Sequence, residues 1–315
     1  MPSDTIGVRE WAVFFLCVAL WGSAYALVET ALADHSPPAV IVAARLWMAT
    51  AMLHVYWGWR QRQGAAEGRT PGVQGKLFWL GAFGTTIPFS LLSWGQQHID
   101  SGLAGILAAI TPLIVAGLAP LLGQDRKLTV VRAVGLGLGF AGVITLMGPE
   151  ALSGLGGGGS LALLGQLAAA GAALSYAVNG LMARAGKPIP VLEASAGWTF
   201  YGAVLATPFA FHALATMPPP GAIAWTAILA LAVGPTAVAS VGYFWLVRRS
   251  GPTFVTQTNY AIPLWAVLLG ALALGERLAP QAFAALALIG LGLFVAQDGL
   301  RAGLRLISRA SPADR

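Results

Sequence analysis

Hydrogen-bonding and aromatic side chains recur at helical intervals within long apolar segments of this sequence. In residues 77–97, Thr86, Ser90 and Trp94 follow one another at intervals of four and therefore share one face of a helix. Because polar groups that face lipid are costly, we expect this face to line an interior cavity. A cavity rich in hydroxyl groups and aromatic rings would bind a small molecule through hydrogen bonds and ring contacts.

Residues that could contact such a molecule come from both halves of the sequence. For any single Ser or Thr among them, the alternative use is a hydrogen bond between helices. The predicted substrate-binding residues are Trp21, Ser23, Tyr25, Thr86, Ser90, Trp94, Thr111, Ser175, Tyr176, Asn179, Thr236, Tyr243, Asn259 and Tyr260.

The predicted cavity is almost free of charge, because no Asp, Glu or Lys lies in the central third of any apolar segment. A site for strongly cationic drugs would need a carboxylate, and a site for phosphate-bearing substrates would need several converging Lys or Arg side chains. Neutral or zwitterionic molecules with apolar side chains fit better. Arg45, about two turns inside its segment, is expected either to pair with Glu29 or to extend toward the membrane interface.

Neither a metal site nor a cofactor site is expected. The four histidines are scattered without the spacing of metal ligands, and Cys17 is a single cysteine. The run Gly156–Gly159 is not followed by the Gly-Lys-Ser/Thr sequence of a phosphate-binding loop, so it is interpreted as a flexible connector. An integral membrane enzyme, the main alternative class, would need paired acids or a His-Glu-x-x-His helix, and neither is present.

The composition is typical of a membrane protein with many spans. Of the 315 residues, 57% are hydrophobic and only 10% are charged, against about 25% in soluble domains, and the mean hydropathy is +0.73. The sequence pI of about 9.9 does not indicate nucleic-acid binding, because the basic residues form no block or stripe. The expected surroundings are therefore a lipid bilayer and a small-molecule substrate.

Ten apolar runs are long enough to cross the roughly 30 Å hydrocarbon core as helices. The runs are continuous rather than alternating, which favours an all-α membrane protein. They cover residues 11–31, 38–58, 77–97, 102–122, 129–148, 160–183, 191–211, 222–247, 253–273 and 280–297.

The basic residues predict the orientation of these ten spans. All of the 18 Lys and Arg residues except Arg45 and Arg277 fall in the two terminal tails or in connections on the same side. Since Lys and Arg are enriched in cytoplasmic loops, both termini are expected in the cytoplasm, for a multi-pass protein of the bacterial inner membrane. Residues 11–33 could instead be a cleaved signal ending at Ala31-Leu32-Ala33, but the run is longer than a typical signal core.

The two halves repeat with an offset of about 150 residues. Thr111-Pro112-Leu113 corresponds to Ile262-Pro263-Leu264, and the Gly-Leu-Gly-Leu run at 135–138 recurs at 290–293. Five spans per half is an odd number, so the second half must be inverted in the membrane, which is typical of alternating-access transporters. We divide the chain into a first five-helix repeat (1–148), a Gly-rich connector (149–159), a second repeat (160–300) and a basic cytoplasmic tail (301–315). Helix breaks are predicted at Pro88, Pro112, Pro235 and Pro263.

Several short motifs in this order resemble the EamA family of the drug/metabolite transporter superfamily. They are Leu20-Trp21-Gly22-Ser23, Ala44-Arg45, the mid-helix prolines Pro112 and Pro263, and the segment 274–278, Leu-Gly-Glu-Arg-Leu. The first half departs from the family pattern at Gly123-Gln124-Asp125, where Gly-Glu would be expected. The resemblance implies ten helices, a cavity lined mainly by the first, third, fourth, sixth, eighth and ninth, and export of small metabolites, including amino acids.

The sequence therefore predicts an exporter of small neutral or zwitterionic metabolites, most readily apolar or aromatic amino acids, that is not an enzyme. A multidrug exporter of the same superfamily is the alternative within transporters, and a receptor or structural membrane subunit would show no flux. The ionisable groups Glu29, His54 and Glu193 are peripheral, which favours facilitated diffusion or exchange over proton coupling. A monomer or a homodimer is expected.

Overall fold

The computed structural model of the chain describes residues 6–65, 68–95, 98–99, 107–124, 128–147, 159–262, 264–265 and 280–296. Every element assigned within these ranges is a helix. Pro263, the side chains of Tyr25 and Glu29, and residues 149–158 of the predicted connector lie outside the described residues.

Helical segments lie within each of the five apolar ranges predicted for the first half. The third range holds one interrupted helix, in which a π-helical segment joins two α-helices. The elements are α1 (Val8–Ala33), α2 (Pro38–Arg62), α3 (Gln74–Gly81), the π-helical η1 (Ala82–Thr86), α4 (Ile87–Gly95), α6 (Thr111–Leu118) and α7 (Val130–Met147).

The second half repeats this pattern, including a π-helical segment in its third helix. Its elements are α8 (Gly159–Arg184), α9 (Val191–Thr216), α10 (Ala222–Leu231), the π-helical η3 (Ala232–Val238), α11 (Ala239–Ser250), α12 (Pro252–Thr256) and α14 (Pro280–Ala296). In the described part of the chain, α1, α2, α8 and the continuous helix Ala222–Ser250 are long and apolar enough to cross a membrane.

The turn after α1 joins the two halves of the molecule at one end. Pro37 is extended and Pro38 occupies the first turn of α2, where its missing N–H breaks no helical hydrogen bond. The carboxylate of Asp34 accepts a hydrogen bond of 2.8 Å from the N–H of Ala224, in the first turn of α10. The start of α10 is therefore capped by a residue from the opposite half of the chain.

Basic residues gather at the other end of the bundle, which we call the basic end. There Arg249 at the end of α11 forms an ion pair of 3.2 Å with Glu10, at the start of α1. Arg184, the last residue of α8, donates a hydrogen bond of 2.6 Å to the carbonyl of Val247. Lys76 donates one of 2.6 Å to the carbonyl of Ala185, and partial burial lowers the pKa of its ammonium group. Connections that the sequence assigns to one side thus meet at one end.

These contacts also give the relative direction of corresponding helices. The start of α1 lies beside the end of α11, and so does the end of α8. Helices α1 and α8, the first of each half, therefore run in opposite directions, as an inverted duplication requires.

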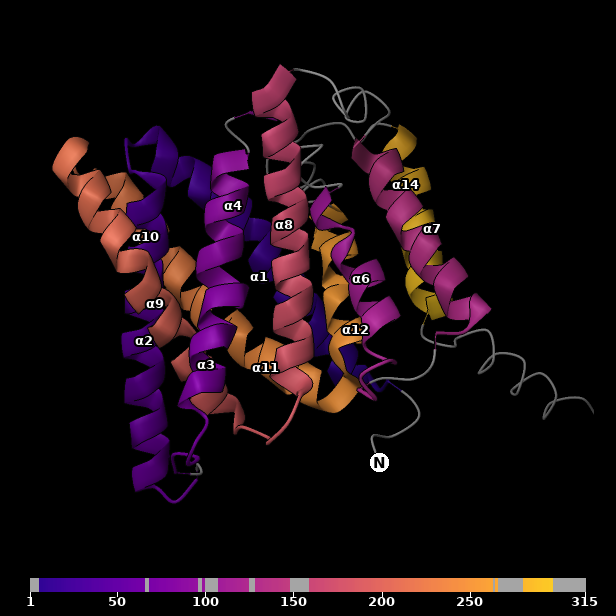
Figure 1. Cartoon of the computed structure of the whole chain (residues 1–315), viewed down its shortest axis with the longest axis horizontal. Coiled ribbons are helices and arrows are strands. Elements are labelled where there is room, and N and C mark those ends of the chain that lie inside the picture. The colour runs from indigo at the N-terminus through magenta and orange to yellow at the C-terminus, as the bar shows by residue number, and fades with distance from the viewer. Residues whose placement is uncertain are drawn as a thin grey trace, which may run out of the picture.

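Corresponding helices of the two halves pack in matched pairs. The second helices, α2 and α9, lie together on one side of the bundle, and the fifth helices, α7 and α14, lie together on the other (Figure 1). Helix α1 packs on α10 and α11, and its counterpart α8 packs on α4. All of these contacts join one half of the chain to the other, and α1 and α8 each pack on the interrupted helix of the opposite half.

Small residues allow α7 and α14 to approach closely. A Cβ atom on Gly292 would lie 2.7 Å from the carbonyl oxygen of Gly135 and 2.5 Å from the backbone nitrogen of Gly139. Gly135 and Gly139 are one turn apart, so this face of α7 is occupied by α14 of the same chain.

We expect Gly292→Val to destabilise this pair by about 1–3 kcal/mol, because the added side chain overlaps the backbone of α7. Gly137→Val is the matched control, since a Cβ on Gly137 meets no described atom within 4 Å. Thermal unfolding of both variants in detergent measures the difference. Equal melting temperatures would contradict the close packing of α7 on α14.

Candidate functional site

The interrupted helix of the first half is completed by side chains of α8. In a π-helix each carbonyl accepts a hydrogen bond from the N–H five residues later, and Pro88 has no N–H to offer Phe83. The hydroxyl of Ser175 donates a hydrogen bond of 2.8 Å to this Phe83 carbonyl. One turn further along α8, the amide of Asn179 donates one of 2.9 Å to the carbonyl of Leu80. These two predicted site residues satisfy backbone groups at the helix break.

The corresponding break in the second half is completed by its own side chains and by α1. The hydroxyl of Thr236, the residue after Pro235, donates a hydrogen bond of 2.8 Å to the carbonyl of Leu231, where the π-helical segment begins. The indole N–H of Trp21 on α1 donates one of 3.1 Å to the carbonyl of Pro235. The first helix of each half therefore supports the broken helix of the other half.

Four side chains meet between the two breaks, and we call them the central cluster: Trp21, Asn179, Trp198 and Tyr243. The hydroxyl of Tyr243 donates a hydrogen bond of 2.7 Å to the side-chain oxygen of Asn179. The Tyr243 ring stacks on Trp198, with centroids 5.8 Å apart, and contacts Trp21 edge-on at 6.2 Å. Three of these four residues were predicted from the sequence.

Trp198 lies in the seventh apolar range, 191–211, from which no substrate-binding residue was predicted. Its indole nitrogen is buried and has no hydrogen-bond partner in the described part of the chain. A Cβ atom on Gly84 would overlap this nitrogen and approach Asn179, so the glycine in η1 allows both side chains to reach the helix break. Gly84 is the feature of the sequence that could have indicated this contact, but its importance is clear only when Trp198 and Asn179 are known to lie against it.

Arg45 is buried in the interior of the bundle and does not extend to the interface. This residue of α2 is only 7% exposed. Its Nε donates a hydrogen bond of 2.9 Å to the hydroxyl of Thr236. Its guanidinium carbon lies 5.0 Å from the ring centroid of Phe89 on α4. Tyr176 of α8 is near enough to interact with it electrostatically. Among the side chains that the structure describes, no carboxylate lies within ion-pairing distance of Arg45.

Other predicted residues contribute contacts between helices. Ser23 donates a hydrogen bond of 2.7 Å to the carbonyl of Ala19 and accepts one of 3.3 Å from the indole of Trp265. Thr111 is fully buried at the start of α6, and its hydroxyl contacts the carbonyl of Ala173 on α8 at 3.2 Å. Both hydroxyls thus join segments that are distant in the sequence.

The predicted stripe of the third helix does not lie in one environment. Thr86 is buried and donates a hydrogen bond of 3.0 Å to the carbonyl of Gly202 on α9. Ser90 and Trp94 are exposed, and the Trp94 ring contacts His98. The three residues share a helix, but only Thr86 is enclosed.

The two predicted residues from the ninth range differ in burial. Asn259 is half-buried. Tyr260 is 1% exposed, and its ring lies where a Cβ on Gly139 of α7 would be. Of the predicted helix breaks, Pro112 lies in the first turn of α6, after a turn at 109–110.

Glu193 has a role that the sequence did not indicate. This residue on α9 is 2% exposed, and its carboxylate accepts hydrogen bonds of 2.9 and 2.5 Å from the backbone N–H and the hydroxyl of Thr70. It thereby fixes the connection between α2 and α3 to the start of α9.

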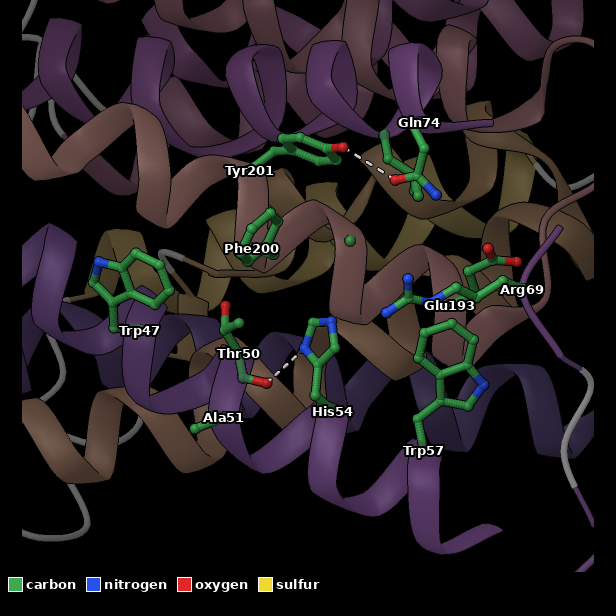
Figure 2. A pocket seen from close by; sticks show the side chains of 12 residues that line it. Trp47, Thr50, Ala51, His54, Trp57, Arg69, Gln74, Glu193, Phe200 and Tyr201 are labelled. Carbon is green, nitrogen blue, oxygen red and sulfur yellow. Dashed lines mark hydrogen bonds between the residues drawn. The ribbon is translucent and has the colours of Figure 1, made fainter. Parts of the chain in front are cut away.

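A cavity of about 530 Å³ lies among α2, α3, α9 and the connection before α3 (Figure 2). None of the predicted substrate-binding residues lines it. The lining residues are Trp47, Thr50, Ala51, His54, Trp57, Arg69, Gln74, Leu77, Glu193, Gly197, Phe200 and Tyr201.

Comparisons with known proteins agree with this architecture. A model of the EamA-like transporter family matches residues 9–148 and 163–296, which is most of the chain. The inner membrane transporter YedA of Escherichia coli K12, whose name describes it as uncharacterized, is 27% identical over 284 residues, covering 89% of this chain and 87% of the relative. A solved crystal structure that is 22% identical superposes with a TM-score of 0.73 over 91% of this chain and 97% of that chain, which shows the fold.

Two further relatives show how far the similarity extends. A protein of Streptantibioticus cattleyicolor named as a probable terminal-alkyne amino-acid exporter is 28% identical over 301 residues, 95% of this chain and 93% of that one. An uncharacterized transporter of Archaeoglobus fulgidus is 25% identical over 148 residues, so the match spans about half the length of that relative. The family match covers both halves, and the chain therefore belongs to the EamA-like transporter family and is a multi-pass membrane transporter of the drug/metabolite type.

Proposed function

We propose that this transporter exports amino acids with apolar or aromatic side chains across the inner membrane of a bacterium. In this proposal ten helices cross the bilayer, and both termini and the basic end lie in the cytoplasm. The gathering of Arg184, Arg249 and Lys76 at one end of the bundle supports this orientation, because basic residues are retained on the cytoplasmic side.

The observation that carries the substrate class is the buried guanidinium of Arg45. An ionisable group inside a membrane bundle is costly and usually marks a substrate pathway. Thr236 and Phe89 hold Arg45 in the interior, and no described carboxylate neutralises it. A guanidinium binds a carboxylate through two parallel hydrogen bonds, so the carboxylate of an amino acid would pair with Arg45.

The central cluster would accommodate the rest of the substrate. Its rings, Trp21, Trp198 and Tyr243, offer an apolar wall for an aliphatic or aromatic side chain. Carbonyl groups at the proline breaks are hydrogen-bond acceptors suited to an ammonium group. The relative from Streptantibioticus cattleyicolor, named as a probable amino-acid exporter, supports the same class.

Alternating access would proceed at the two interrupted helices. Because η1 and η3 occupy corresponding positions and each is supported by a helix of the opposite half, rocking of one half against the other would change both breaks together. Glu193 is bound to Thr70, which supports facilitated diffusion or exchange over proton transfer through this carboxylate.

The competing function within the superfamily is export of cationic drugs. A buried arginine that pairs with no described carboxylate would repel such substrates, so Arg45 favours the amino-acid proposal.

The proposal is tested by uptake of radiolabelled amino acids into proteoliposomes, with and without a pH gradient. We expect Arg45→Gln to lower transport roughly tenfold or more, since hydrogen bonds to charged groups contribute about 1.5–3 kcal/mol. Arg62→Gln, an exposed residue at the end of α2, is the matched control and should transport normally.

The same assay separates loss of recognition from loss of folding. Wild-type protein should discriminate between an amino acid and its amide, which lacks the carboxylate, whereas Arg45→Gln should lose this discrimination. Equal transport of acid and amide by the wild type would contradict the role of Arg45, and preferential transport of aromatic cations would support the multidrug alternative.

The support of the first break by α8 gives a second prediction. Ser175→Ala removes the donor to the Phe83 carbonyl, and we expect a loss of about 0.6 kcal/mol, typical of hydrogen bonds between membrane helices. Ser195→Ala is the matched control, because Ser195 only donates to the Val191 carbonyl of its own helix. Amide hydrogen exchange should accelerate at residues 82–90 in Ser175→Ala alone, and unchanged exchange there would contradict the assignment.

A further inference from the structure

The cavity among α2, α3 and α9 has a polar end and an aromatic end. Figure 2 shows Arg69 and Glu193 at one end and Trp47 at the other. Glu193 and Gln74 belong to the basic end of the bundle, where α9 and α3 begin. A cavity with this division fits an amphiphile whose head lies at the basic end and whose chain runs along the helices.

The aromatic part of the cavity is open to the surface of the bundle. Trp47 is 42% and Phe200 36% exposed, and their ring centroids are 6.0 Å apart. The His54 ring continues this wall, 6.1 Å from Phe200 and 6.1 Å from Trp57. In a membrane protein, an apolar surface of this kind on two long helices faces the acyl chains of lipids.

The polar end carries a positive charge that no described residue pairs. Arg69 is exposed and makes no hydrogen bond or ion pair within the described part of the chain. The carboxylate of Glu193 is bound to Thr70 instead of Arg69, and both of its oxygens accept hydrogen bonds from Thr70. The guanidinium of Arg69, at the polar end of the cavity, is therefore available to bind an anion.

Two further polar atoms are available along the cavity. The ring nitrogen Nδ1 of His54 lies 2.9 Å from the carbonyl of Thr50 and must donate to it, since a carbonyl only accepts. The second ring nitrogen, Nε2, then remains for a ligand. Thr50 is 6% exposed, and its buried hydroxyl has no hydrogen-bond partner among the described residues.

We propose that this cavity binds an anionic phospholipid, with its phosphate at Arg69 and one acyl chain along Trp47 and Phe200. Basic pockets between membrane helices on the cytoplasmic side are suited to anionic head groups, and the aromatic wall suits the chain. The site is separate from the central cluster, so the proposal holds whichever metabolite is transported.

Native mass spectrometry of the purified full-length protein tests the proposal, with phosphatidylglycerol and phosphatidylcholine of identical acyl chains as probes. Wild-type protein should bind phosphatidylglycerol more tightly. Arg69→Gln should weaken that binding roughly fivefold, the effect of one basic residue near an anionic membrane surface, and abolish the preference. Arg62→Gln, which is exposed at the same end but does not line the cavity, is the matched control and should retain it.

A second variant and two competitors keep the outcomes distinct. Ala51→Trp adds a large side chain to the cavity wall and should weaken binding of both lipids, while circular dichroism confirms that each variant is folded. Glycerol phosphate and amino acids should not displace the lipid. Equal binding of both lipids by the wild type, equal losses in Arg69→Gln and Arg62→Gln, no effect of Ala51→Trp, or displacement by either competitor would each overturn the proposal.

Discussion

In the hydrocarbon of a bilayer, every backbone N–H and carbonyl must find its partner within the protein, and this constraint shapes the centre of the molecule. Pro88 and Pro235 each remove a donor from a helix that is expected to cross the membrane. Side-chain hydroxyls donate to carbonyls at both breaks, Ser175 to Phe83 and Thr236 to Leu231. These side chains bring polar groups to a depth where they would otherwise be costly.

The support of an interrupted helix by side chains of the opposite half occurs twice, because the two halves of the chain are repeats. Helix α8 supports the break in the first half, and α1, through Trp21, supports the break in the second. Pairing of α2 with α9 and of α7 with α14 holds the two halves together around this centre. Each half therefore completes the other, and neither interrupted helix is supported by its own half alone.

Much of the fold could be predicted from the sequence, because length and hydropathy determine where apolar helices lie. The inward orientation of Ser175 and Asn179 was also predictable, since polar residues one turn apart in an apolar helix are expected to face the interior of the bundle and not the lipid. The π-helical register could not be predicted, since a proline indicates a break but not how its carbonyls are satisfied. The inward position of Arg45 depends on Thr236, which is distant in the sequence, and the cavity at Arg69 depends on three separate segments.

A structure determined with a bound amino acid would test the central claim most directly. The account predicts the carboxylate within hydrogen-bonding distance of the Arg45 guanidinium and the side chain against Trp21 and Tyr243. An amino acid bound away from Arg45, with this guanidinium still held only by Thr236 and Phe89, would contradict it.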